Sequence, residues 1–164
     1  VGLIDVGGGA STLVDALLVR GHIDLTVLDV SAHGLDLARD RLRSRADSVT
    51  WIVTDLLSWV PPRRYAVWHD RAVFHFLTDA SDRATYVRRA NDAVAPGGHV
   101  VMATFGPDGP LQCSGLPVVR HSAEDLAALF SEGFELVDSS TQEHVTPAGV
   151  SQSFTHALLV RKES

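Results

Sequence analysis

Short apolar runs recur along the chain at intervals that predict buried strands. They are rich in leucine, β-branched and aromatic side chains, and the first four carry an aspartate at or next to their end. The runs are residues 3–6, 25–30, 49–55, 65–70 and 99–105. We expect each run to form one strand.

Segments with helical spacing of their apolar residues lie between and after these runs. The predicted helices are residues 11–20, 31–45, 78–98 and 123–130. Ser31 can cap the second helix, and the Pro-Gly-Gly run at 96–98 stops the third. The chain therefore alternates between predicted strands and predicted helices.

The last part of the chain has strand-like character. Residues 134–145 and 151–162 flank TPAG at 146–149, whose proline and glycine suit a turn, so the two segments are predicted to form a hairpin. Strands that alternate with helices pair in parallel, because a parallel crossover needs a long connection. The sequence predicts a single α/β domain over residues 1–164: a doubly wound, Rossmann-like seven-stranded sheet, mostly parallel, with an antiparallel C-terminal hairpin.

The composition is that of one globular domain. Of 164 residues, 45% are hydrophobic and 21% charged, and no apolar run reaches the length of a membrane span. The start, VGLIDVGGG, lacks a secretory signal pattern, and the single cysteine, Cys113, cannot form an internal disulfide. We therefore expect a cytoplasmic protein that does not enter a membrane. The first strand follows Val1 almost at once without an initiator methionine, so we also expect a natural N-terminal segment to be missing.

The charge and histidine patterns disfavour two classes of partner. The net charge is −6, and an acidic protein repels a phosphate backbone, so no nucleic acid is expected. The basic cluster RDRLRSR at 39–45 lies in a predicted helix and is interpreted as a solvated helix face. The eight histidines lack the spacing of a closed metal site, so no metal is expected.

Carboxylates mark the predicted carboxyl ends of the first four strands. Asp5, Asp29, Asp55 and Asp70 hold these positions. Ligands of open α/β sheets bind outside the carboxyl ends of the strands. A rim of carboxylates suits a ligand with hydroxyl groups, amines and positive charge better than it suits a pyrophosphate.

The glycine run after the first strand fits a dinucleotide fingerprint only in part. The run is Gly7, Gly8 and Gly9. The G-x-G-x-x-G pattern meets Thr12 where its last glycine belongs, and Asp5 would place a negative charge near the phosphates. Asp29 can bind ribose hydroxyls in either kind of site. A NAD(P)-dependent oxidoreductase therefore stays open as an alternative.

Taken together, the motifs resemble the class I S-adenosylmethionine-dependent methyltransferases, of the small type that consists of the methyltransferase domain only. The resemblance runs from IDVGGGAST through VLDV, VTD and WHDRAVFHFLTD to APGGHVVMATF, which is nearly the whole chain. Each motif is weak alone, but their order and spacing are specific. The resemblance implies an enzyme whose cofactor is S-adenosyl-L-methionine.

The resemblance also implies which residues hold the adenosine part of this cofactor. Asp29 would bind the ribose diol in a bidentate contact, and Val30 would pack against the adenine. Asp55, together with the Leu56 backbone, would contact the adenine edge.

The methionine end of the cofactor is assigned by the same resemblance. Asp5 would bind its amino group, and the glycine run would let the backbone pass close to it. Asp70 and Arg71 would border the methionine end and the substrate. Ser11 stands where the family often has a glycine, a small departure in this loop.

Methyl transfer from a sulfonium is an in-line displacement, so the enzyme must first align nucleophile, methyl group and sulfur. An acceptor that has to lose a proton needs a base nearby. His69, Asp70 and His75 are the candidates for this base. His75 is equally well interpreted as a histidine packed in an apolar turn.

The segment after the fifth predicted strand, residues 106–121, should form a shaped loop that carries specificity. Cys113 and Arg120 are its candidate substrate-binding residues. Arg120 would hold an anionic group or simply pin the loop, and a passive loop thiol is the favoured interpretation of Cys113.

The methyl acceptor stays open among nitrogen, oxygen and sulfur atoms. A small molecule is preferred, because the compact chain has no long acidic loops for a basic peptide. A protein lysine methyltransferase is an alternative, since DRAVFHFL also resembles a stretch of such enzymes. A non-catalytic, methyltransferase-like binding module is a further alternative, and the oligomeric state is open.

Overall fold

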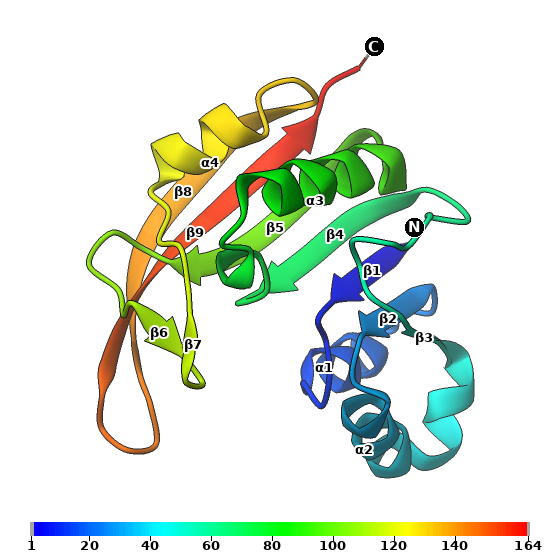
Figure 1. Cartoon of the computed structure of the whole chain (residues 1–164). Helices are drawn as coiled ribbons and strands as arrows, with labels where there is room; N and C mark the ends of the chain where they lie inside the picture. The colour runs from blue at the N-terminus through cyan, green and yellow to red at the C-terminus, as the bar shows by residue number, and fades with distance from the viewer. Residues whose placement is uncertain (1, 164) are drawn as a thin grey trace.

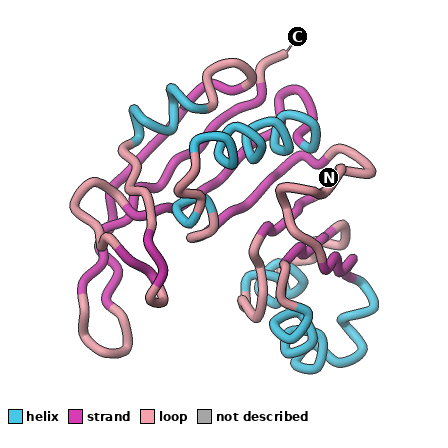
Figure 2. The backbone as a smooth tube through the Cα atoms, in the orientation of Figure 1, coloured by secondary structure: helices cyan, strands magenta, loops and turns pink. Residues whose placement is uncertain are grey.

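Seven strands pair into one sheet in the computed structural model, which describes residues 2–163 (Figures 1 and 2). The strands of this sheet are β1 (Leu3–Val6), β2 (Leu25–Asp29), β3 (Val49–Val53), β4 (Tyr65–Arg71), β5 (Val94–Phe105), β8 (Phe134–Val145) and β9 (Ser151–Arg161). Their order across the sheet is β3-β2-β1-β4-β5-β9-β8. The chain thus reverses direction across the sheet between β1 and β4.

The pairing of the strands agrees with the prediction. β1 to β5 pair in parallel with their neighbours, whereas β9 is antiparallel to both β5 and β8. The predicted hairpin of β8 and β9 is confirmed at the edge of the sheet. Its turn is closed by a hydrogen bond from Thr146 N–H to Val150 O at 2.9 Å, and Gly149 takes the φ of +81° that favours glycine.

In the described part of the chain, four α-helices cover the two faces of the sheet (Figure 1). They are α1 (Leu13–Val19), α2 (Ala32–Leu42), α3 (Ala80–Ala93) and α4 (Ala123–Leu129). Beneath α3 and α4, Tyr86 and Phe130 belong to the larger core together with Trp68 of β4. Beneath α1 and α2, Leu35 packs in a smaller core with Val27 of β2. Both faces of the parallel strands are therefore apolar, as the near-continuous hydrophobic runs predicted.

Several element ends differ from the prediction for local reasons. Helix α1 begins at Leu13 rather than at residue 11, because the Ser11 hydroxyl accepts the Leu13 N–H at 3.2 Å ahead of the helix. Ser31 caps α2 as predicted, accepting the Gly34 N–H at 3.0 Å, and the helix continues as the 3₁₀ segment η1 (Arg43–Ser48). Strand β5 begins at Val94 rather than at His99, because Val94 already pairs with Tyr65 of β4.

Two connections complete the fold. No helix was predicted between β3 and β4, and within the described residues this connection has none; Leu56 and Trp59 pack from it into the larger core. The loop at 106–121 contains a small hairpin of β6 (Gln112–Cys113) and β7 (Leu116–Pro117). Ser114 and Gly115 turn this hairpin with positive φ angles.

Candidate active site

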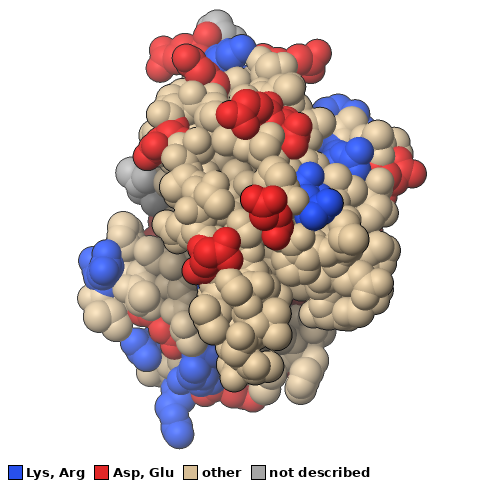
Figure 3. Space-filling model, turned by 90° about the vertical axis from the view of Figure 1, so that its left-hand side faces the viewer, with Lys and Arg blue, Asp and Glu red and all other residues tan. Residues whose placement is uncertain are grey.

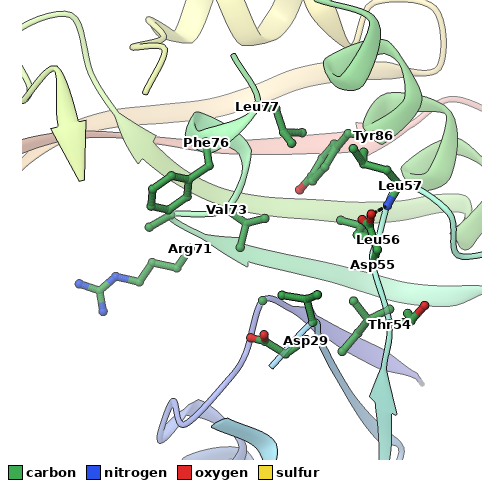
Figure 4. Close-up of a pocket in the computed structure, with 14 residues that line it drawn as sticks. Asp29, Thr54, Asp55, Leu56, Leu57, Arg71, Val73, Phe76, Leu77 and Tyr86 are labelled. Atoms are coloured by element: carbon green, nitrogen blue, oxygen red, sulfur yellow. Dashed lines mark hydrogen bonds between the residues drawn. The ribbon is translucent and has the colours of Figure 1, made fainter. Parts of the chain in front are cut away.

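Two adjoining cavities lie at the carboxyl ends of the parallel strands. We call the first, of about 370 Å³, the apolar cavity; its lining includes Val30, Leu56, Val73, Phe76, Leu77 and Tyr86, with Asp29 and Asp55 among them (Figure 4). The second, of about 610 Å³, is the polar cavity; its lining includes Asp5, Gly8, Ala10, Ser11, Thr12 and His69. Gly7 and Arg71 line both cavities, so the two form one cleft at the point where the strand order reverses.

Two carboxylates of the apolar cavity are each held by one oxygen only. Asp29 Oδ1 accepts the Ser31 N–H at 2.8 Å, and Asp55 Oδ1 accepts the Leu57 N–H at 3.0 Å. This geometry fixes the direction of each carboxylate and leaves its second oxygen for a ligand. Val30, the residue after β2, lines the same cavity, is 73% exposed and offers an apolar surface to a ligand.

The glycine run brings the first loop close to its neighbours. A Cβ on Gly7 would lie 2.0 Å from Val73 Cγ2, and one on Gly8 would lie 2.5 Å from Val27 Cγ1. Gly7 also has a φ of +66°, which favours glycine. A side chain at Gly7 would push into Val73, in the segment after β4 that lines the apolar cavity.

Asp5 and His69 form a hydrogen-bonded pair at the floor of the polar cavity. They lie opposite each other in the parallel ladder of β1 and β4, and His69 Nδ1 is 2.8 Å from Asp5 Oδ1. The Asp5 side chain is 7% exposed and the His69 side chain 25%. A carboxylate acceptor at Nδ1 favours the tautomer with its proton there, which leaves Nε2 as the free, basic nitrogen.

Asp70 does not lie on the rim of carboxylates where the sequence had placed it. Successive strand residues point to opposite faces, so Asp70 faces α3 while His69 and Arg71 face the cleft. Asp70 is fully buried, accepts the Val73 N–H at 3.0 Å, and also accepts a hydrogen bond from the Tyr86 hydroxyl. Burial raises the pKa of the Asp70 carboxyl to about 6, although both hydrogen bonds oppose this rise. Its contacts favour a supporting role over the predicted contact with substrate.

His75 is likewise held inside the protein. It is fully buried in the 3₁₀ turn η2 (Phe74–Phe76), and its Nδ1 accepts the Phe105 N–H at 3.1 Å. Its carbonyl oxygen accepts the Val119 N–H at 2.8 Å, which ties this turn to the loop after β5. Burial lowers the pKa of the imidazole to about 4, so it is neutral at pH 7. These contacts favour the packed histidine over the base.

The two candidates in the loop after β5 lie outside both sets of lining residues given above. Cys113 is half-buried against a cluster of Ala103, Phe105 and Phe154. Arg120 donates to Gly109 O at 3.2 Å and so pins its own loop. Substrate binding by Cys113 and Arg120 stays a prediction.

Arg71 is the charged group at the junction of the cavities. It is exposed at the end of β4, and its guanidinium lies 6.0 Å from the centre of the Phe154 ring. No carboxylate in residues 2–163 lies within ion-pair distance of it. Sequence reasoning found Arg71 but missed Phe76, Leu77 and Tyr86, although the apolar run FHFL lies within the recognised segment WHDRAVFHFLTD.

The structure also bears on metal sites, membrane spans and the distribution of surface charge. Among residues 2–163, no three His, Cys, Asp or Glu side chains gather in a way that could hold a metal ion, and no helix is long and apolar enough to cross a membrane. On the face shown in Figure 3, acidic and basic side chains are interspersed and most of the surface carries neither. The expectation that nucleic acid is not a partner stays a prediction.

Known proteins share this arrangement. The sequence matches the family described as "Methyltransferase domain" over residues 3–98, and no curated protein sequence matches it. Among solved structures, N-methyltransferase NodS from Bradyrhizobium japonicum WM9, with S-adenosyl-L-homocysteine, is similar with 18% identity and a TM-score of 0.78, over 99% of this chain and 78% of that chain. A methyltransferase from Methanosarcina mazei is similar with 14% identity and a TM-score of 0.81, over 99% and 93%. The 1,6-didemethyltoxoflavin-N1-methyltransferase from Burkholderia thailandensis is similar with 18% identity and a TM-score of 0.75, over 98% and 71%.

Replacing Gly7 with alanine tests the close contact of the two loops. Gly7→Ala should destabilise the protein by more than Gly21→Ala, since Gly21 also has a positive φ, of +86°, but nothing within 4 Å of its absent Cβ. We expect about 1–2 kcal/mol of backbone strain from either change, and an added cost from the Val73 clash in Gly7→Ala alone. Urea unfolding measures both, and equal losses would refute the contact.

The buried His75 should make stability depend on pH. An ordinary histidine has a pKa of 6.5, whereas the pKa of His75 in the folded protein is about 4. Between these two pH values the imidazole is protonated in the unfolded chain but not in the folded protein. His75→Asn keeps an acceptor for the Phe105 N–H but does not titrate. As pH falls from 6.5 towards 4, the free energy of unfolding of the wild type should drop relative to this variant, by up to about 1.4 kcal/mol per pH unit.

This comparison cancels the opposite effect of Asp70, which is present in both proteins. Because the pKa of Asp70 is raised, the folded protein gains a proton there before the unfolded chain does, which favours folding as pH falls. His22→Asn, at an exposed histidine, serves as the control and should behave as the wild type does. A stability difference between wild type and His75→Asn that stays constant over this range would contradict the prediction.

Proposed function

The chain belongs to the class I S-adenosylmethionine-dependent methyltransferases, since the methyltransferase-domain family spans more than half of it, and we propose that it methylates a nitrogen, oxygen or sulfur atom of a small molecule. The observation that carries this proposal is the Asp5–His69 pair in the polar cavity, next to the junction with the apolar one. It supplies a base where an acceptor proton has to leave.

The residues of the cleft fit S-adenosyl-L-methionine. The glycine run keeps the first loop closely packed beside the cleft, since a Cβ on Gly7 would collide with Val73 and one on Gly8 with Val27. We assign Asp29 to the ribose hydroxyls, and Val30, Asp55 and Leu56 to the adenine, because these residues line the apolar cavity.

The polar cavity suits the amino-acid end of the cofactor. Asp5 retains Oδ2 for its amino group, and Gly7 and Gly8 line the same cavity. Arg71 makes no ion pair within residues 2–163 and is available to an anionic group at the junction.

When bound, the cofactor supplies an electrophilic methyl group on a sulfonium. The chain then has to hold the acceptor in line and remove its proton. His69 is the residue we propose for that proton, which would pass to Nε2 while Asp5 stabilises the imidazolium through Nδ1. Asp70 and His75 would hold the segments that frame the site without touching the acceptor.

A small acceptor is favoured over a protein. Two solved structures of similar fold are named for transfer to a small molecule or glycopeptide: the toxoflavin-precursor enzyme and the glycopeptide N-methyltransferase MtfA. The alternative of a NAD(P)-dependent oxidoreductase has no support from the family that the chain matches.

Cofactor binding is tested first by calorimetry. S-adenosyl-L-homocysteine should bind the wild type, and Asp29→Asn should weaken it by roughly tenfold or more, because one ribose hydroxyl loses a charged acceptor. NAD and NADP are the control ligands, and Asp36→Asn, an exposed carboxylate on α2, is the control variant. Binding unaffected by Asp29→Asn would remove Asp29 from the site.

The acceptor class and the base are tested with methyl-labelled cofactor. The label should enter small amines, phenols or thiols rather than protein, and His69→Asn should lower kcat by about 10²–10⁴-fold while the affinity for S-adenosyl-L-homocysteine stays unchanged. Asparagine can still donate to Asp5 but has no Nε2. His22→Asn is the matched control.

Each other outcome selects a different function. Label in lysines of protein would favour the protein methyltransferase. Binding without transfer to any acceptor would favour the non-catalytic module. An unchanged kcat in His69→Asn would exclude the base while leaving methyl transfer itself intact.

A further inference from the structure

Arg41 of α2 reaches back to the loop that follows β1. Its Nη1 donates to Ala10 O at 3.1 Å and its Nη2 to Ser11 O at 2.9 Å. The same guanidinium binds Asp15 of α1 in a bidentate pair, from Nε to Oδ1 at 2.9 Å and from Nη2 to Oδ2 at 2.6 Å. One side chain thus joins α2, α1 and the loop across 26 to 31 positions of the sequence.

These contacts revise the interpretation of the basic cluster as a solvated helix face. Arg39, one of its members, fits that view: it meets Asp36 only at 3.9 Å, and the two side chains are 53% and 65% exposed. Arg41 is 33% exposed and Asp15 22%. The arginine at 41 is therefore part of a partly buried contact, whereas its neighbour at 39 is a surface charge.

The contact determines how the loop faces the polar cavity. In a trans peptide the carbonyl and the following N–H point in opposite directions. Arg41 holds the carbonyls of Ala10 and Ser11 on its own side and so fixes the orientation of two peptide groups in the segment that lines the polar cavity. The Ser11 N–H, on the opposite side of its peptide, donates to Gly8 O at 2.8 Å. Arg41 itself is not among the lining residues, so it acts from behind the loop.

The loop needs such support, because glycine-rich backbone has more freedom to lose than any other. Gly7 and Gly9 both have positive φ angles. At the start of the loop, Gly7 N–H and Gly8 N–H donate to Leu28 O of β2 at 2.7 and 3.3 Å, whereas further along the bonds from Ser11 N–H to Gly8 O at 2.8 Å and from Leu13 N–H to Ser11 Oγ at 3.2 Å are local. Arg41 supplies a long-range restraint at Ala10 and Ser11.

We propose that Arg41 is a positioning residue for the methionine end of the cofactor: by clamping the Ala10 and Ser11 carbonyls to α2 it preorganises the loop that binds this end. The inference rests on the proposed assignment of the polar cavity. Asp15 holds the clamp in place, and its hydrogen bonds from Arg41 lower the pKa of this carboxyl, so the pair stays charged at neutral pH.

The test replaces Arg41 with lysine and compares it with Arg39→Lys on the same helix. Lysine keeps the charge but offers a single nitrogen, which cannot reach two carbonyls and both Asp15 oxygens. In the ligand-free protein, amide exchange at Ser11 and Leu13 should accelerate about tenfold in Arg41→Lys, whereas exchange in strand β5 stays unchanged. In Arg39→Lys neither should change.

Calorimetry on the same proteins measures the consequence for binding. The Kd of S-adenosyl-L-homocysteine should rise about tenfold in Arg41→Lys and stay constant in Arg39→Lys, with kcat at saturating cofactor changing less than KM. In Arg41→Ala, added guanidinium should restore part of the affinity, which a general loss of stability would not allow.

The outcomes separate this inference from the proposed function. Unchanged exchange at Ser11 and Leu13 would overturn the clamp whether or not any ligand binds. Faster exchange with an unchanged Kd would overturn its role in binding. A wild type that does not bind S-adenosyl-L-homocysteine would refute the assignment of the polar cavity and with it the role in binding, while the exchange data would still decide the clamp itself.

Discussion

The parallel pairing of β1 with β4 is the constraint on which the rest of the cleft depends. It is the point where the strand order reverses, so the chain leaves β1 toward α1 and leaves β4 toward α3 on the opposite face, and a crevice opens between the two departing loops. The register also sets Asp5 opposite His69 and Val6 opposite Asp70. A slip of one residue would exchange the faces of every side chain on β4.

Because side chains along β4 point alternately to the two faces of the sheet, three consecutive residues have different roles. His69 and Arg71 face the cleft, whereas Asp70 faces α3 and binds Val73 N–H and the Tyr86 hydroxyl. Because Tyr86 and Val73 line the apolar cavity, the buried Asp70 carboxylate holds part of the wall of this cavity in place. Trp68 Nε1 completes this network by donating to the Tyr86 oxygen at 3.0 Å. The polar groups of Trp68 and Tyr86 in the larger core therefore have hydrogen-bond partners.

The sequence was sufficient for the features that depend on local pattern. Strand runs, the Ser31 cap, the closing hairpin and the acids at Asp29 and Asp55 all follow from spacing and from the rule that parallel strands end at one edge. It was insufficient where the outcome depends on which face a side chain takes or on contacts distant in sequence. From the sequence alone, Asp70 and His75 are predicted to be site residues, but strand alternation and burial place their side chains inside the protein. Arg41 looks like a surface charge, because its partners at Ala10 and Ser11 lie about thirty positions away.

The Asp5 carboxylate has two tasks in the proposed site, and they are coupled. One oxygen holds His69 Nδ1 and the other is assigned to the amino group of the cofactor. The charge of Asp5 stabilises both cations, an ammonium group on one side and an imidazolium on the other, and each cation draws on the same negative charge. The two steps are thus linked through one buried acid, and loss of Asp5 would disturb binding and proton transfer together, whereas loss of His69 Nε2 separates them.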